Sequence, residues 1–372
     1  MNMKERLGNY IQEYSVRNKT GEDIPVYSVT NTQGFCRDYF GKEVASKDKT
    51  TYKIVPRGCF AYNPSRINVG SVDYQRYEDR VIVSPLYNVF SVSDNLDKQY
   101  LYYYLKSNIT LQRIKDVASG SVRDNLKLSM LYEFPINVGP ISEQRAIIGK
   151  IDGIKNIIEL RKQQLQQLDE LVKARFVEMF GDCENRVAIN DLCSIITDGT
   201  HQPPKFQNEG IPFIFVSNLA NNMVTYNSEK FISDETYNEL IKRTPIEIGD
   251  ILLTTVGSYG HPAVVVENRK FLFQRHIAYL KPIHNLVNSF YMHSAMLSPD
   301  VQRQIEEKVK GIAQKTLNLS EIRKIIIPVP SIEEQNAFEV FIKQVDKSKV
   351  AVQKALDEAQ ILFDSLMQEY FG

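Results

Sequence analysis

A long segment of this chain occurs twice, at a constant distance in the sequence. The first copy covers residues 142–180, and the second begins at Glu333 and continues to residue 372. Adding 191 to a residue number in the first copy gives the matching position in the second, so Glu143-Gln144 corresponds to Glu334-Gln335. Two equal segments at equal intervals suggest two globular units held at a fixed distance.

Both copies are predicted to be long helices. Neither contains proline, and both are rich in residues that favour helices. Apolar residues recur at alternating intervals of four and three, and eight of ten such positions are apolar in the first copy and nine of ten in the second. This seam indicates a coiled coil. It consists of Ile147, Ile151, Ile154, Ile158, Arg161, Leu165, Leu168, Val172, Arg175 and Met179, then Phe338, Ile342, Val345, Lys349, Val352, Leu356, Ala359, Phe363, Leu366 and Tyr370.

Two alternatives stay open for these helices. Each could be a single amphipathic helix on a globular core, although the duplication argues against this. The charged seam positions Arg161, Arg175 and Lys349 either extend along the coiled coil to reach water or fix its register. At about 1.5 Å per residue, a helix of about 39 residues is roughly 58 Å long, which suits a spacer.

Composition limits the class of protein. A chain of 372 residues has room for two domains, and its net charge is zero, so a basic surface must be local. The four cysteines form no CxxC pair, which favours a reducing cytoplasm. The first residues lack an apolar leader segment, and no apolar run approaches about 18 residues, so we expect neither a signal peptide nor a membrane span.

Each long helix follows a predicted globule of mixed α and β structure. In the first globule, strands are expected at Ile24–Val29, on both sides of Pro56-Arg57-Gly58, and within Arg80–Val92, before a helix from Gln99 to Ala118. Residues 183–330 repeat this order, with a matching helix beginning at Ser289. The sequence therefore predicts an α+β fold with an internal pseudo-two-fold repeat. Its parts are residues 1–140, 141–182, 183–330 and 331–372.

This organisation resembles the specificity subunit of type I restriction–modification enzymes over essentially the whole chain. The residues that carry the resemblance are PxSEQ and PSIEEQ before the helices, LVKARFVEMFGD after the first, and DGTHQPP, GIPFIFVSNL and GDILLTTVGS in the second globule. The resemblance implies that each globule is a target recognition domain for one half of a bipartite, asymmetric DNA site. It also implies an antiparallel coiled coil of the long helices that sets the gap between the halves.

The resemblance further implies partners. Two modification subunits would dock on the helices and carry adenine methylation with S-adenosylmethionine, and restriction subunits using ATP and Mg would join through them. This chain would bind double-stranded DNA, no cofactor, no metal and no membrane. One departure is that the first globule lacks a DGTHxPP segment, since LGNYIQEYSVRN stands in its place. The contacts of the first half-site are therefore less defined than those of the second.

The sequence contains no complete motif of a methyltransferase, a nucleotide-binding enzyme or a metal site. The segment Asn63-Pro64-Ser65-Arg66 lacks the second proline and the aromatic residue of an NPPY methyltransferase motif. The sequence contains no GxxxxGK[ST] loop, and its five histidines show no metal-ligand spacing. We therefore expect no enzyme activity in this chain, and the hypothesis of a self-sufficient methyltransferase is disfavoured.

Local charge supports DNA binding. Residues 106–127 and residues 301–324 each carry a charge of +3, in corresponding elements, and each segment contains a glycine loop. Three further loops are predicted to reach base edges, with Arg66 suited to guanine and Asn63 to adenine. Turn chemistry alone also explains many of these residues, and Asp198 and Thr200 could simply hold their loop. The candidates are Asn63, Ser65, Arg66, Ser71, Lys115, Ser119, Ser121, Arg123, Thr200, His201, Lys205, Thr255, Ser258, Tyr259, His261, Lys310, Gln314 and Lys315.

A rival hypothesis from another class is an interaction scaffold with no DNA role. Its globules would bind proteins at a spacing that the helices set. A salt titration separates the two hypotheses, because binding driven by phosphate contacts weakens steeply as salt rises.

Overall fold

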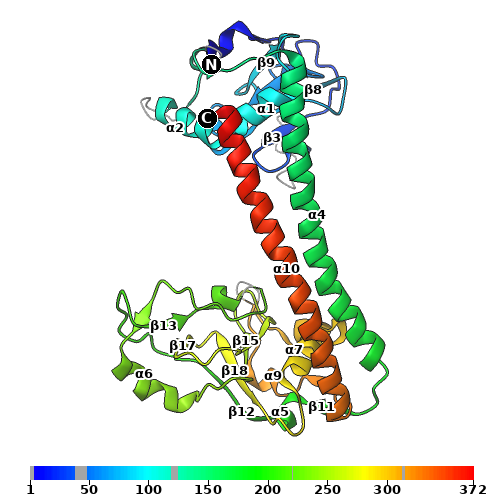
Figure 1. Cartoon of the computed structure of the whole chain (residues 1–372), viewed down its shortest axis with the longest axis vertical. Coiled ribbons are helices and arrows are strands. Elements are labelled where there is room, and N and C mark those ends of the chain that lie inside the picture. Colours follow the sequence, from blue (N-terminus) through cyan, green and yellow to red (C-terminus); the bar gives the residue numbers. More distant parts are fainter. Residues whose placement is uncertain (1–3, 38–47, 119–124, 220, 312–314) are drawn as a thin grey trace. The chain divides into compact units, whose positions relative to one another are not determined.

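The computed structural model describes residues 4–37, 48–118, 125–219, 221–311 and 315–372. The chain divides into two compact units (Figure 1). Unit 1 holds residues 1–162 and 354–372, and unit 2 holds residues 163–353. The division passes through both long helices, so each unit contains part of each helix. Among the described residues, no helix is long and apolar enough to cross a membrane.

Unit 1 is built around a four-stranded antiparallel sheet of order β2-β9-β6-β7. The unit also contains three two-stranded pairings, β1-β10, β3-β4 and β5-β8. The predicted strand Ile24–Val29 is shorter than expected, since Val26 makes an isolated bridge and β3 begins at Ser28. The strands are β1 Glu5–Arg6, β2 Ile11–Glu13, β3 Ser28–Thr30, β4 Gly34–Cys36, β5 Lys53–Pro56, β6 Phe60–Tyr62, β7 Val72–Tyr74, β8 Arg80–Val83, β9 Asn88–Val92 and β10 Pro135–Ile136.

Unit 2 has a four-stranded antiparallel sheet of order β12-β18-β15-β16. Its other sheets are β14-β13-β17 and β11-β19. The strands are β11 Arg186–Ala188, β12 Cys193–Asp198, β13 Ile211–Ile214, β14 Phe231–Ile232, β15 Ile251–Thr254, β16 Pro262–Val264, β17 Leu272–Phe273, β18 Ile277–Pro282 and β19 Ile326–Pro328. Shorter helices are α5 Ile189–Leu192, η3 Val216–Leu219, α6 Asp234–Leu240 and η4 Ile241–Arg243.

The prediction of a single helix from Gln99 to Ala118 is wrong, because the structure has two helices there, α1 and α2. Ser107 is extended, and its hydroxyl accepts a hydrogen bond from the Thr110 amide at 3.3 Å. A serine in this conformation ends one helix and caps the next. The matching helix in unit 2 breaks at Ser298, where Pro299 follows. The helices are η1 Leu7–Asn9, η2 Ile67–Val69, α1 Lys98–Lys106, α2 Asn108–Ala118, α3 Leu128–Tyr132, α7 Ser289–Leu297, α8 Pro299–Lys308 and α9 Leu319–Ile322.

The two repeated segments form the helices α4, Ile141–Phe180, and α10, Ile332–Phe371. The predicted capping box of α10 is present. The Ser331 hydroxyl accepts a hydrogen bond from the Glu334 amide at 3.3 Å, and the Glu334 carboxylate accepts one from the Ser331 amide at 3.0 Å. These contacts satisfy amides that the first turn of a helix leaves unpaired.

The predicted seam holds along most of both helices but shifts at the end of α4. Phe176 and Phe180 are buried there, whereas the seam positions Arg175 and Met179 are exposed. At the end of α10, Met367 and Phe371 are buried beside the predicted Leu366 and Tyr370, which are half-buried. The aromatic residues pack against the globules, Phe371 against Tyr100 and Phe180 against Tyr291. The core of the adjoining globule therefore displaces the helix–helix pattern in the last turns.

The parts of α4 and α10 in each unit contact each other. In unit 1, Ile151 of α4 shares a core cluster with Met367 and Phe371 of α10. In unit 2, the Phe180 ring lies 5.4 Å from the Phe338 ring, and Lys349 Nζ lies 2.7 Å from Asp169 Oδ1. Residue numbers rise along α4 while those of their α10 partners fall, so the segments in unit 2 run in opposite directions. Lys349, one of the charged seam residues, thus forms an ion pair between the helices.

A buried glutamine joins the start of each long helix to its globule. Gln144 Oε1 accepts from the Asp97 amide at 2.8 Å, and Gln335 Oε1 accepts from the Asn288 amide at 2.8 Å. Each Nε2 donates to two backbone carbonyls, those of Asn95 and Gly139 in unit 1 and those of Leu286 and Pro330 in unit 2. All of these pairs lie 191 residues apart. The bounds of α1 and α7, and of α4 and α10, also differ by 191.

Candidate nucleic-acid interface

Three predicted loops converge in unit 2. The segment 254–261, which follows β15, contacts the segment around Lys315, because the Gly257 amide donates to the Lys315 carbonyl at 3.2 Å. The Leu317 amide donates to the Thr255 carbonyl at 2.8 Å. The Thr255 amide donates to the His276 carbonyl at 2.9 Å, and the Gly199 amide donates to the neighbouring Ile277 carbonyl at 3.1 Å. Backbone hydrogen bonds thus link segments that are distant in sequence.

The side chains of these loops differ in how available they are. Ser258 and Lys205 are exposed, and Lys315 lies over the Tyr259 ring at 5.9 Å. Lys310 is also exposed, and it pairs through its backbone with Thr316. In contrast, Thr255 is buried. His261 is half-buried, with Nδ1 lying 3.3 Å from Asn222 Oδ1. The exposed and cationic members of the set are therefore the better candidates for contacting a polyanion.

The Asp198 carboxylate, in the DGTH segment, contacts the side chains of His201 and Arg243. It lies 3.0 Å from His201 Nε2 and accepts a hydrogen bond from Arg243. Thr200 pairs through its backbone, its amide donating to the Phe273 carbonyl at 2.9 Å. The carboxylate thus holds two cation-forming side chains at the surface. Sequence reasoning missed Arg243, because nothing in its local pattern links it to a loop more than forty residues away.

In unit 1, the segment Asn63–Ser71 contains η2 and packs against α2. Asn63 Oδ1 accepts hydrogen bonds from the Ser65 amide at 3.1 Å and the Ser65 hydroxyl at 2.9 Å. These bonds use the lone pairs of Oδ1, the atom that would accept from the amino group of adenine in a bidentate contact. Arg66 is exposed, and its guanidinium makes no hydrogen bond or ion pair with the residues that the structure describes. Ser71 is buried.

The chain after α2 returns to this segment. The Leu126 amide donates to the Pro64 carbonyl at 3.1 Å, which matches the bond from Leu317 to Thr255 in unit 2 at an offset of 191. Lys115 of α2 is exposed. The predicted residues Ser119, Ser121, Arg123 and Gln314 lie outside the described residues. In each unit, the chain after the glycine loop therefore contacts the loop that follows β6 or β15.

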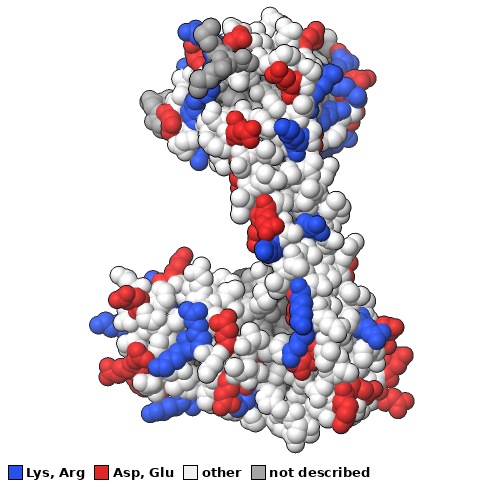
Figure 2. Space-filling model, viewed as in Figure 1, with Lys and Arg blue, Asp and Glu red and all other residues white. Residues whose placement is uncertain are grey.

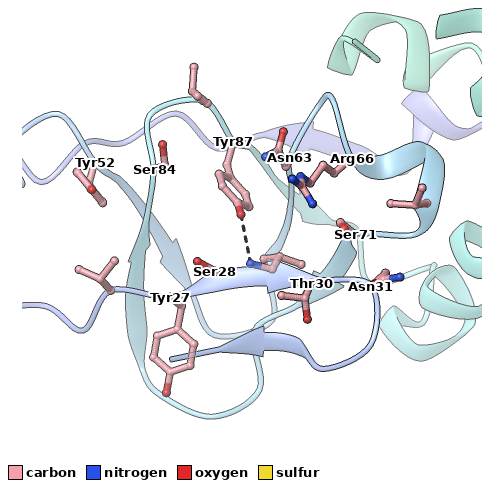
Figure 3. A pocket seen from close by; sticks show the side chains of 14 residues that line it. Tyr27, Ser28, Thr30, Asn31, Tyr52, Asn63, Arg66, Ser71, Ser84 and Tyr87 are labelled. Carbon is pink, nitrogen blue, oxygen red and sulfur yellow. Dashed lines mark hydrogen bonds between the residues drawn. The ribbon is translucent and has the colours of Figure 1, made fainter. Parts of the chain in front are cut away.

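A pocket of about 460 Å³ lies beside the Asn63–Ser71 segment (Figure 3). β3 forms one wall, and residues 84–87 form another. The Tyr87 hydroxyl accepts a hydrogen bond from the Val29 amide at 3.3 Å, and burial raises the pKa of this phenol, so it stays protonated. The sequence did not single out this pocket. Its lining residues are Val26, Tyr27, Ser28, Val29, Thr30, Asn31, Tyr52, Asn63, Arg66, Val69, Ser71, Ser84, Leu86 and Tyr87.

Lys106, at the end of α1, joins the chain after β3 to the chain after η2, on one side of the pocket. Its ammonium donates to the Asn31 carbonyl at 3.0 Å and also to the Gly70 carbonyl. Burial lowers the pKa of this lysine, with nearby Lys155 acting in the same direction and Asp73 opposing it. On the face shown in Figure 2, basic and acidic side chains are interspersed in both units. A nucleic-acid surface must therefore use local groups of cations.

Comparisons with known proteins show a consistent relationship. A family model described as type I restriction modification DNA specificity domain matches residues 7–170 and again residues 184–360. The chain is 23% identical over 314 residues to the specificity subunit of the type I restriction enzyme EcoBI from Escherichia coli, covering 74% of this chain and 64% of that protein. It is 23% identical over 297 residues to the MjaIX specificity subunit of Methanocaldococcus jannaschii, covering 74% and 68%.

Solved structures share the fold. A chain from a type I R-M system, studied for complex assembly and conformational transition, aligns over 99% of this chain and 97% of its own, with a TM-score of 0.62 and 18% identity. The type I restriction–modification S subunit from M. genitalium aligns over 99% and 96%, with a TM-score of 0.50 and 15% identity. The alignment to the EcoBI subunit spans less than two thirds of that protein.

Proposed function

Because this chain belongs to the family of type I restriction modification DNA specificity domains, we propose that it is the DNA-recognition subunit of a type I restriction–modification complex. Each unit would read one half of a bipartite, asymmetric site. The double match to the family model, once in each half of the chain, is the observation that carries this proposal. The chain would recognise DNA without catalysing its modification.

The site geometry supports DNA recognition in both units. In unit 1, Arg66 is exposed next to the returning chain at Leu126. In unit 2, Lys315, Tyr259 and Lys205 border the converging loops. Lysine and arginine contact phosphates, and an unpaired arginine can also read guanine in the major groove. Different side chains at matching places in the two units agree with two different half-sites.

The long helices would form an antiparallel coiled coil that sets the gap between the half-sites. The opposite directions of the helix segments in unit 2, and the matching glutamine contacts of the two units, support a pseudo-two-fold repeat. Leu171 and Leu362, which lie 191 residues apart, are 47% and 46% exposed. Two similar apolar surfaces suit two similar partners, which would be modification subunits.

The partners would supply the cofactors. S-adenosylmethionine would bind the modification subunits, and ATP and Mg would bind restriction subunits that join the complex through them. The four cysteines are free, which agrees with the cytoplasm as the place where this complex would act.

A map of methylated adenines in the host genome, with and without this gene, tests the proposal. We expect an interrupted two-part motif to disappear when the gene is deleted. An unchanged map, with the gene expressed beside an active modification subunit, would contradict the proposal. A salt titration of the purified chain on the resulting DNA site should then show steep weakening, whereas a protein scaffold would show little salt dependence.

A further inference from the structure

We propose that the pocket of unit 1, which Arg66 helps to line, accepts one nucleobase that has left the base stack of the bound duplex. This inference rests on the proposed function. The pocket volume of about 460 Å³ lies in the range of small-ligand pockets, roughly 300–1,000 Å³. It is therefore large enough for a flat heterocycle.

The location of the pocket favours DNA as the source of this base. Asn63, Arg66 and Ser71 belong both to its lining and to the predicted reading segment of unit 1. Lys106 lies next to its wall through the bond to the Asn31 carbonyl. A duplex that contacts Arg66 would therefore also lie over the mouth of the pocket.

The lining suits a neutral heterocycle that carries both donors and acceptors. Among the residues that the structure describes, no acidic or lysine side chain lines the pocket, and Arg66 is its single charged residue. The hydroxyls of Ser28 and Ser84 make no hydrogen bond with the residues that the structure describes, so they are available to a ligand. The Tyr87 ring adds aromatic surface, whereas the Tyr27 ring points away from the pocket and packs against Phe35 (Figure 3). Proteins that hold unstacked bases combine such rings with hydrogen bonds to the base edge.

Two apolar side chains at the pocket are unusually exposed. Leu86 is 76% exposed and Val69 is 54% exposed. Leu86 lies between β8 and β9, and Val69 is the last residue of η2. Leucine is among the residues that proteins insert between base steps, where it fills the space that an unstacked base leaves. We therefore assign Leu86 as the residue that occupies the gap in the stack.

Unit 2 lacks this combination at the matching positions. Gly257 stands where Arg66 stands in unit 1 at the offset of 191. The pairing of β9 with β6, and of β18 with β15, places the half-buried His276 where Leu86 stands. Unit 2 instead carries the DGTH segment that the first globule lacks. The pocket thus provides unit 1 with a recognition element of its own.

The experiment uses the full chain, bound to its modification subunits, and the duplex that the methylation map identifies. Fluorescent base analogues, 2-aminopurine for adenine and pyrrolocytosine for cytosine, replace one base at a time across the half-sites. Free deoxynucleoside monophosphates are titrated separately. Ser84→Phe fills the pocket, Leu86→Ser removes the inserted side chain, and Ser93→Phe is the control, because Ser93 is exposed and does not line the pocket.

We expect fluorescence to rise at one position with the wild-type chain and with Ser93→Phe, and to stay low with Ser84→Phe and Leu86→Ser. Ser84→Phe should weaken cognate binding about tenfold, comparable to the loss of one base contact. An abasic nucleotide at that position should make wild type and Ser84→Phe bind equally. Leu86→Ser is a surface change, so it tests the idea even if Ser84→Phe fails to fold.

Three outcomes would overturn the inference. One is normal cognate binding with no responsive position. Another is unchanged binding and fluorescence in both pocket variants. The third is tight binding of a free nucleotide that leaves duplex binding unaffected, which would make the pocket a metabolite site. A wild-type complex that shows no preference for the mapped duplex would instead contradict the proposed function.

Discussion

Single residues in the reading loops separate into those that hold the loop and those that face outward without a partner. Asn63 and Asp198 belong to the first kind, since their oxygens bond to Ser65 and to His201 and Arg243. Arg66 and Lys115 belong to the second kind among the described residues. Arg66 lies in a predicted reading loop whereas Lys115 lies on α2, so the two cations have distinct expected roles, because only a residue within reach of base edges reads sequence.

Arg66→Ala should lower affinity for the cognate site by about 1–3 kcal/mol and relax specificity at one base pair. Lys115→Ala is the matched comparison, because it also removes an exposed cation of unit 1. It should weaken binding to all duplexes alike and reduce the slope of log K against log salt by about one. Binding to a panel of single-base variants at several salt concentrations measures both effects. An equal loss on every sequence in Arg66→Ala would assign that residue to phosphate contact.

At the scale of the elements, the ends of the long helices pack against the globules as well as against each other. Phe180 contacts Tyr291 of α7 with ring centroids 5.0 Å apart, and Phe371 contacts Tyr100 of α1 at 5.1 Å. The neighbouring seam position Met179 is 37% exposed. The last turn of α4 is thus anchored by its aromatic residues.

Phe180→Ala should destabilise unit 2 by about 3–5 kcal/mol, because it leaves a cavity in a closed core. Met179→Ala should cost less than about 1 kcal/mol, since the side chain is partly in water. Denaturant unfolding of the two variants measures this contrast. Similar losses in both would favour the uninterrupted seam expected from the sequence over the arrangement in the structure.

The glutamines that begin the long helices make a second test at this scale. Removing Gln144 leaves the Asp97 amide and the Asn95 and Gly139 carbonyls without their partner. Gln144→Ala should therefore cost about 2–4 kcal/mol, as should Gln335→Ala in unit 2. Because the two sites share no residue, the double variant should show the sum of the two losses in the free energy of unfolding. A loss in one unit alone would contradict their equivalence.

For the whole molecule, the proposed spacer sets the gap in the DNA site. In unit 2 the segments of α4 and α10 run in opposite directions, and residues 160–166 and 351–357 correspond at the offset of 191. Deleting both removes about 10 Å of helix, which corresponds to roughly three base pairs of DNA. The methylated motif should keep its two half-site sequences and lose about three base pairs from its gap. Altered half-site sequences with an unchanged gap would contradict the role of the helices as a spacer.

The sequence by itself determined the two long helices, because a seam that repeats over many turns is a local pattern that one helix must satisfy. It also determined the capping box at Ser331 and the repeat distance of 191. The breaks at Ser107 and Ser298 carried a local signal too, since serine caps helices. The uninterrupted apolar pattern around each serine hid that signal.

The tertiary structure decided which loops meet. The bond from Leu126 to Pro64, the pairing of Asp198 with Arg243, and the pocket between β3 and the segment 84–87 join residues far apart in sequence. The burial of Phe176 and Phe180, in place of the seam positions of α4, likewise depends on their contact with Tyr291, which lies on α7. Periodicity reports which face of an element is apolar, but the partner of that face is chosen by how the globules pack.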